Sequence, residues 1–228
     1  ENEIKVIKKY FASFGFMIGL DISDNQTDKN YFSRIKIEND KYQLYLNPLH
    51  FFRQGINEEN HIYFYDDVNT NSILELVKHI KNLNRKIKCE LSEYNITYDT
   101  NAKNDVHIYL HINSFGGYVF DSLAAVDTII KSEIPIVSII EGCAASAATF
   151  LSIVCQKRHM REHASMLIHQ LSGGCWGTFE QMKDDMKNSK YLMKIIKDIY
   201  IKYTNDKLQE DKLDEFLQRD IWWAPKKC

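Results

Sequence analysis

The apolar run IPIVSII at residues 134–140 constrains the fold of this chain more than any other feature of the sequence. Most of its residues are β-branched, and the run does not alternate between apolar and polar positions as a half-exposed strand does. A strand of this kind is typical of a parallel sheet covered by helices on both faces. The run therefore predicts an α/β protein with a buried central strand.

The segments around this run alternate between strand and helix patterns. We expect further strands at 42–46, 61–65, 106–112 and 165–169, and helices at 72–83, 121–130, about 145–154, 178–203 and 211–217. Thr178 and Gln181 have the spacing of a capping box at the start of the longest helix. Residues 84–104 are polar, and we expect an exposed insertion there. This alternation predicts an α/β fold with a largely parallel sheet.

The composition excludes several classes of function. The chain has 228 residues, 44% of them hydrophobic, and its net charge is −2, so it carries no electrostatic footprint for nucleic acid. Its five cysteines are scattered without a C-x-x-C pair, which favours reduced thiols inside a cell and argues against structural zinc. No apolar run is long enough to span a bilayer, and the charged N-terminus has no signal-peptide pattern. We expect an intracellular protein without nucleic-acid or membrane partners.

Ser146 is a lone serine among alanines in the middle of the small, apolar stretch EGCAASAATF at 141–150. We expect it in the first turn of a helix that begins near Ala145, where free N–H groups and the helix dipole favour developing negative charge. A nucleophile is one interpretation, and a capping or packed helical serine is the other. The stretch is not a G-x-S-x-G elbow, because positions 144 and 148 are both alanine.

Two further segments carry residues that suit acyl chemistry. NSFGG at 113–117 closes a strand, and its paired glycines could present a donor to an oxyanion or simply form a tight turn. His169 ends the apolar segment MLIHQ, where it could be a general base or a core histidine; His111 and His163 are the nearest competitors. The glycine-rich segment after Gln170 could form an edge that pairs with an extended peptide.

Four blocks in this sequence resemble the signature blocks of ClpP, the caseinolytic serine peptidase family. They are INSFGG at 112–117, GCAASAATFL at 142–151, MLIHQLSGG at 166–174 and RDIWWAP at 219–225. They occur in the family's order, and the match runs from about His61 to Pro225. The resemblance implies a catalytic triad in which Ser146 is the nucleophile, His169 the base and Asp220 the group that orients the imidazole. It also implies an oxyanion hole made by the N–H groups of Gly117 and Ala147.

The resemblance implies an architecture and an assembly as well. The fold would be the ClpP/crotonase-like fold of repeated ββα units, with 1–58 as an N-terminal extension of unclear structure, 59–228 as the peptidase domain and 178–203 as a long handle helix. The handle would interdigitate between two stacked heptameric rings of identical subunits. Substrate-binding positions would be Gly116, Gln170, Leu171, Ser172, Gly173 and Gly174.

The partners implied by the family are unfolded polypeptides and a hexameric Clp-class ATPase, while the peptidase itself needs no metal and no other cofactor. We expect a cytoplasmic location, with an organelle matrix or the plastid stroma as the alternative. Phe115 stands where the family has proline, and Trp222 and Trp223 are bulkier than the usual pair.

Three other functions remain open from the sequence. The chain could be a catalytically silent ClpP-like subunit of a mixed ring, although all three triad residues are present. It could be a crotonase-fold acyl-CoA enzyme, in which an oxyanion pair stabilises an enolate, but a triad is superfluous for that chemistry. A Ser–Lys peptidase of the signal-peptide type is weakened by the histidine block and by the lack of a membrane anchor.

Overall fold

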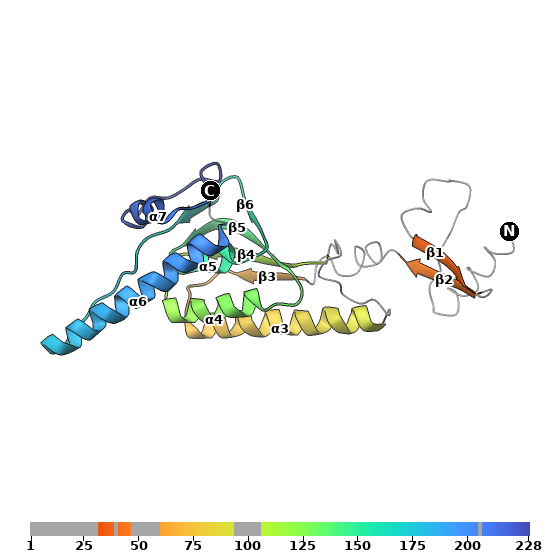
Figure 1. The fold of residues 1–228 in the computed structure, drawn as a ribbon, viewed down its shortest axis with the longest axis horizontal. Helices are drawn as coiled ribbons and strands as arrows, with labels where there is room; N and C mark the ends of the chain where they lie inside the picture. The colour runs from red at the N-terminus through yellow and green to blue at the C-terminus, as the bar shows by residue number, and fades with distance from the viewer. Residues whose placement is uncertain (1–31, 39–40, 47–59, 94–105, 205–206) are drawn as a thin grey trace. The chain divides into compact units, whose positions relative to one another are not determined.

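The computed structural model describes residues 32–38, 41–46, 60–93, 106–204 and 207–228 (Figure 1). The chain divides into two compact units, Glu1–Gln54 and Gly55–Cys228. In the first unit, β1 (Phe32–Glu38) and β2 (Lys41–Leu46) form an antiparallel pair, and the predicted strand at 42–46 lies within β2. The division into an extension at 1–58 and a peptidase domain at 59–228 stays a prediction.

The second unit is built on one parallel sheet with the strand order β3-β4-β5-β6. These strands are β3 (His61–Phe64), β4 (Ile108–Ser114), β5 (Ile136–Ala145) and β6 (Lys157–Met160), and a short strand β7 (Ser165–Leu167) also pairs with β5. All of these pairings are parallel, as predicted. Residues 136–140 of the apolar run form the first half of β5, the central strand. The strand β6 was not predicted, because its sequence KRHM is polar and mostly exposed.

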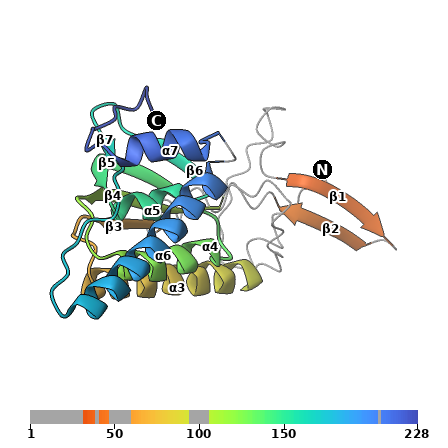
Figure 2. The same ribbon diagram turned by 60° about the vertical axis from the view of Figure 1, so that its left-hand side comes forward.

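Five helices are described in this unit: α3 (Thr70–Glu93), α4 (Val119–Ile130), α5 (Ala148–Ile153), α6 (Phe179–Tyr203) and α7 (Glu210–Leu217). α3 and α4 lie side by side along the sheet, and α6 packs against α5 and α7 (Figure 2). Their apolar faces and the sheet enclose a core in which Ile108, Leu110, Ile112 and Leu151 are fully buried. The core fills because the helices have apolar residues at helical spacing and the central strands are apolar throughout.

The expectation of an exposed insertion at 84–104 is wrong for residues 84–93, which continue α3. Ile87 is fully buried and lies about two helical turns after Ile80 on the same face of α3. The side chain of Asn84 donates to Ser132 Oγ at 2.9 Å and accepts from the Ile134 N–H at 2.9 Å. Ile87 and Asn84 hold this part of α3 through burial and hydrogen bonds. The charged residues Arg85 and Lys86 between them interrupt the apolar spacing by which a helix is predicted from sequence. Residues 94–104 lie outside the described residues.

The helix predicted to begin near Ala145 starts later, because β5 continues through Ala145 and α5 begins at Ala148. The pairing of β4 with β5 shifts between Ile112 and Ser114, so that β5 contains a bulge at this point. Asn113 Oδ1 accepts from the Cys143 N–H at 3.1 Å inside the bulge. Gly142 has a φ of +127°, and a Cβ there would come 2.5 Å from Asn113 Oδ1. A glycine is therefore required for the bulge.

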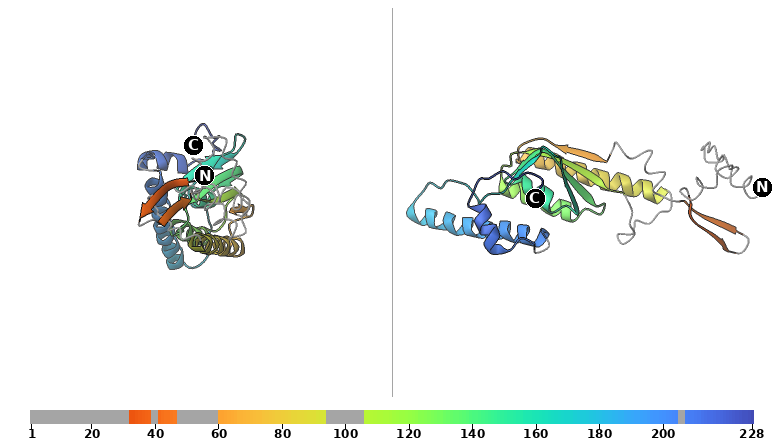
Figure 3. Two further views of the ribbon diagram at one scale, coloured as in Figure 1. Left: turned by 90° about the vertical axis from the view of Figure 1, so that its right-hand side faces the viewer. Right: turned by 90° about the horizontal axis from the view of Figure 1, so that it is seen from above.

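The predicted capping box of α6 is confirmed. Thr178 accepts from the Gln181 N–H, and the Gln181 side chain accepts from the Thr178 N–H at 2.8 Å. The buried residues of this helix, Ile196 and Tyr200, both lie in its C-terminal part. The N-terminal part projects from the rest of the unit (Figure 3). The helix predicted at 211–217 lies within α7.

Candidate active site

Ser146 lies in a sharp turn between the central strand and α5. Its φ is +52°, and it is the one non-glycine residue with a positive φ in the described part of the chain. Its N–H donates to the Leu167 carbonyl at 2.9 Å, and its carbonyl accepts from the Thr149 N–H at 3.0 Å. A serine held in this backbone region costs about 1–3 kcal/mol. Such strain is typical of the nucleophile turn of a hydrolase, here built with alanines on both sides in place of glycines.

His169 lies directly opposite this serine. β7 pairs with the end of β5 so that Leu167 is the partner of Ala145, and His169 follows two residues later. Its Nε2 is 2.7 Å from Ser146 Oγ, within hydrogen-bond distance. The competing histidine His111 lies elsewhere, with its Nε2 2.7 Å from His61 Nδ1. Of the histidines considered from the sequence, the structure thus brings His169 to the serine.

Asp220 is brought to His169 by an antiparallel bridge between Met166 and Trp223. The two residues exchange N–H···O bonds of 2.9 and 2.7 Å. In an antiparallel pairing, the residue three positions after Met166 comes opposite the residue three positions before Trp223, and these are His169 and Asp220. Asp220 Oδ1 is 3.1 Å from His169 Nδ1. The aspartate side chain is 75% exposed in this single chain, whereas the histidine is 23% exposed.

The NSFGG loop lies against the serine turn. Gly116 has a φ of +97°, and a Cβ added there would come 2.8 Å from Ser146 Cβ and 3.0 Å from the Ala147 N atom. The loop is fastened to Val68, whose N–H donates to the Gly116 carbonyl and whose carbonyl accepts from the Tyr118 N–H. Neither of these two bonds involves the Gly117 N–H. The predicted oxyanion donors, Gly117 and Ala147, therefore belong to two adjoining turns, and their role stays a prediction.

The predicted substrate-binding segment begins beside the site and then leaves the body of the unit. The Gln170 N–H donates to the Leu217 carbonyl at 2.9 Å, which ties the segment to α7. The Leu171 N–H is 3.1 Å from Met193 Sδ. Ser172, Gly173 and Gly174 are exposed, and a Cβ at either glycine would meet nothing within 4 Å. The segment is thus accessible to an extended chain, while its role in binding stays a prediction.

Sequence reasoning missed one pair of polar residues under the serine turn. Thr149 is fully buried, and its Oγ1 donates to the Ser146 carbonyl at 2.5 Å. The same oxygen is 2.5 Å from the hydroxyl of Tyr200, a buried residue of α6. Burial raises the pKa of Tyr200, which keeps the phenol neutral and able to donate. No sequence pattern could have found this contact, because it joins residues 51 positions apart on two helices.

A second polar cluster lies around Glu141, the residue before the bulge in β5. The carboxylate accepts from the Tyr65 hydroxyl and from Arg161 at 3.0 Å, and it lies 3.0 Å from His111 Nδ1. The hydrogen bond from Tyr65, aided by those from His111 and Arg161, lowers the pKa of Glu141 to about 2. The same bond raises the pKa of Tyr65 to about 12. This cluster holds a charged group in the central strand, and these contacts do not include Ser146, His169 or Asp220.

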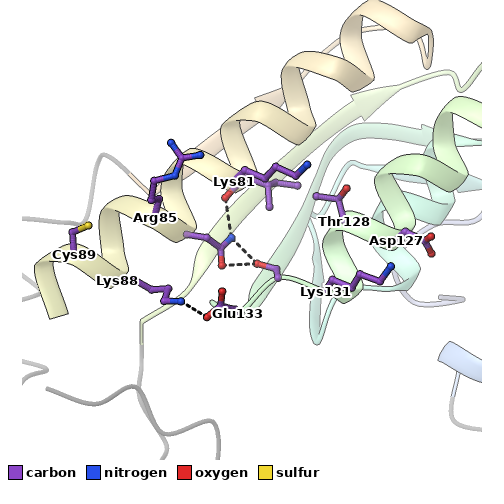
Figure 4. Close-up of a pocket in the computed structure, with 11 residues that line it drawn as sticks. Lys81, Arg85, Lys88, Cys89, Asp127, Thr128, Lys131 and Glu133 are labelled. Carbon is purple, nitrogen blue, oxygen red and sulfur yellow. Dashed lines mark hydrogen bonds and ion pairs between the residues drawn. The ribbon is translucent and has the colours of Figure 1, made fainter. Parts of the chain in front are cut away.

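A pocket on α3 and α4 is separate from both clusters (Figure 4). Lys81, Arg85 and Lys131 line it, together with an ion pair between Lys88 and Glu133. It contains none of the predicted site residues. Among the described residues, no three His, Cys, Asp or Glu side chains are placed to hold a metal ion.

The serine, histidine and aspartate side chains have the mutual geometry by which serine-hydrolase sites are recognised on unrelated folds. The family model of Clp protease matches residues 56–228, and the chain belongs to this family. The prediction of a ClpP-like protein is thereby confirmed.

The chain is 30% identical over 131 residues to a Mesostigma viride protein named ATP-dependent Clp protease proteolytic subunit. This match covers 56% of each protein, so the chain spans about half the length of this curated relative. Among solved structures, a mutant of ClpP1 from Listeria monocytogenes resembles the chain with a TM-score of 0.61 and 16% identity, over 78% of this chain and 89% of the other. The likeness confirms the predicted ClpP-like fold. In the part of the chain that the structure describes, no helix could cross a membrane.

Proposed function

We propose that this chain is a Clp-type serine endopeptidase subunit that hydrolyses peptide bonds of unfolded polypeptides. The observation that carries the proposal is the position of His169, whose two ring nitrogens are 2.7 Å from Ser146 Oγ and 3.1 Å from Asp220 Oδ1. A serine is a weak nucleophile unless a base takes its proton, and a histidine oriented by a carboxylate is the common solution. The predicted triad thus has hydrogen-bonding geometry within a single chain.

In the first half of the reaction, Ser146 Oγ bonds to the carbonyl carbon of the scissile peptide while its proton moves to His169 Nε2. The carbonyl oxygen becomes an oxyanion, which the N–H groups of Gly117 and Ala147 would stabilise by roughly 2.7–4 kcal/mol per donor. When the intermediate collapses, the C–N bond breaks and His169 gives the proton to the leaving amine. The new amino terminus departs, and the other half of the substrate stays as an ester on Ser146.

In the second half, water attacks the ester carbon while His169 Nε2 takes a proton from the water. Collapse of this intermediate releases a carboxylic acid and returns the proton to Ser146. Asp220 would keep the imidazole in the tautomer that has its proton on Nδ1, and it would stabilise the imidazolium formed in each half. No metal or other cofactor is needed for these steps.

Exposed apolar side chains at the start of α6 support the proposed assembly into rings. Phe179, Met182 and Met186 follow one another at helical spacing, with exposed fractions of 67, 40 and 59%, and Trp176, just before the helix, is 100% exposed. A contiguous apolar face of this kind is typical of a protein interface. We propose that it packs against the handle of another copy in two stacked heptameric rings, to which a hexameric Clp-class ATPase delivers unfolded chains. We place the assembly in the cytosol, with an organelle matrix or the plastid stroma as the alternative.

A fluorophosphonate probe tests the proposed activity, because it forms a bond only with an activated serine. We expect labelling of the parent protein, no labelling of Ser146→Ala or His169→Ala, and weak labelling of Asp220→Asn. Ser189→Ala and His163→Ala are matched controls that should be labelled like the parent. Native mass measurement shows whether rings are present. Rings that are not labelled would contradict the proposal and favour the silent-subunit alternative.

A further inference from the structure

Two large aromatic side chains from different loops meet beside the serine cluster. Phe115 belongs to the NSFGG loop, and Trp222 belongs to the segment that carries Asp220. Their ring centroids are 6.3 Å apart at an interplanar angle of 89°, a T-shaped contact. Aromatic rings favour this geometry at separations of 4.5–7 Å. The two residues therefore form one unit, which we call the aromatic pair.

The aromatic pair spans the two segments that complete the site. Phe115 directly precedes Gly116, the residue that approaches Ser146 so closely that no side chain fits there. Trp222 lies two residues after Asp220 and directly before Trp223, which is bonded to Met166. Both rings are thus attached, within one or two residues, to backbone that is held against Ser146 and His169. A substrate carbonyl placed on Ser146 brings the neighbouring substrate side chains close to these rings.

The aromatic pair is exposed although it is apolar. Phe115 is 72% exposed and Trp222 is 44% exposed, whereas the adjacent Trp223 packs on Phe216 with ring centroids 4.8 Å apart. The two neighbouring tryptophans thus have different partners, one in the body of the unit and one at the site. Their contact indicates that the two residues act together.

We propose that the aromatic pair determines specificity, by binding a substrate side chain next to the scissile bond and selecting an aromatic one. This inference rests on the proposed peptidase function. A third ring can meet the exposed face or edge of either residue in the stacked or T-shaped geometry that rings favour. Beyond the area buried, such contacts correspond to a preference of roughly twofold to tenfold over an aliphatic side chain of similar size.

The test uses the assembled full-length protein and internally quenched peptides that differ only beside the scissile bond. The varied residue is Phe, Tyr, Leu or Ala, placed on one side of the bond and then on the other. The variants are Phe115→Leu, Trp222→Leu and the double variant, and Tyr63→Leu is a control for loss of a similarly exposed aromatic ring on β3. The rate of fluorophosphonate labelling is measured for every variant. It reports the reactivity of Ser146 without any contribution from a peptide side chain.

We expect the parent to have a kcat/KM for the Phe peptide several-fold above that for the Leu peptide on one side of the bond. Each Leu variant should bring this ratio close to one while labelling stays near the parent rate. The double variant should lose no more than either single variant, because the two rings act through one contact. An unchanged ratio in labelled variants would overturn this inference and leave the proposed function standing. Absence of labelling in the parent would overturn both.

Discussion

The buried contact of Tyr200 with Thr149 leads to a prediction that links the handle helix to the serine turn. The Tyr200 hydroxyl donates to Thr149 Oγ1, and Thr149 donates in turn to the Ser146 carbonyl, at 2.5 Å in each case. Tyr200→Phe removes the first bond and leaves the second. Thr149→Val removes both hydrogen bonds. The Tyr200 hydroxyl then lacks its partner, and the Ser146 carbonyl loses the bond from the Thr149 hydroxyl. Because Ser146 has a positive φ, loss of one of the two bonds to its carbonyl lets the turn relax.

The magnitudes follow from burial, since Tyr200 is 3% exposed and Thr149 is fully buried. Tyr200→Phe should lower the free energy of unfolding by about 1 kcal/mol, the net value of a typical hydrogen bond. That corresponds to a fall in Tm of about 2–4 °C for a domain of this size. Thr149→Val should cost about 1–3 kcal/mol, because a buried hydroxyl loses its partner. If about 1.4 kcal/mol of this loss also raises the activation free energy for reaction at Ser146, fluorophosphonate labelling should slow by about tenfold.

The assay compares thermal unfolding with the rate of fluorophosphonate labelling in assembled protein. Thr149→Ser keeps the hydroxyl and should restore most of the labelling rate. Tyr191→Phe removes the hydroxyl of an exposed tyrosine on the same helix and is the matched control. If Thr149→Val were destabilised as expected but labelled at the parent rate, the proposed link between α6 and the serine turn would be refuted.

Three further predictions follow from the described contacts. Gly116→Ala should abolish labelling while the far-UV circular dichroism stays unchanged, because its Cβ would lie 2.8 Å from Ser146 Cβ at a φ of +97°; normal labelling would show that the loop can move away. Glu141→Gln should lower the free energy of unfolding at pH 7 by about 1–3 kcal/mol. Because folding lowers the pKa of Glu141 to about 2, its contribution is present above pH 4.5 and is lost as the pH falls towards 2; urea titrations of both proteins should therefore converge at low pH, and a constant gap would contradict this. Thr178→Ala should cost about 1 kcal/mol through the lost cap of α6, measured as a lower Tm, and Thr178→Ser should retain most of the stability.

Much of the fold could be predicted because its signals are local. The central strand was recognisable from a run that is apolar on both faces, and α6 from its capping box and spacing. The second half of α3 could not be predicted from local sequence. It is held by the buried Ile87 and by the bonds of Asn84 to Ser132 and Ile134, which lie just before β5. The strand β6 has no apolar pattern, because pairing with β5 and not burial defines it.

The candidate site could be predicted only through the resemblance. The side chains of Ser146 and His169 are 23 residues apart in sequence, and Asp220 is 51 residues from His169, so no local spacing joins them. The turn at Ser146 was expected to be helical because small apolar residues continue on both sides. What prevents that is the pairing of Ala145 with Leu167 of β7 and the bond from the Ser146 N–H to the Leu167 carbonyl. Contacts of this kind are decided by tertiary packing.

The bulge in β5 has a consequence for how insertions and deletions can be tolerated near Ser146. Between the pairs Ile112–Ile140 and Ser114–Ala144, one strand advances by two residues and the other by four. The surplus is an even number, so the up-and-down parity of side chains is the same before and after the bulge. Removal of a single residue from 141–143 would shorten the bulge and shift Ser146 relative to its partners on β7 and in the loop at 113–117. Length changes in this segment should therefore be tolerated less well than in the exposed segment 172–174.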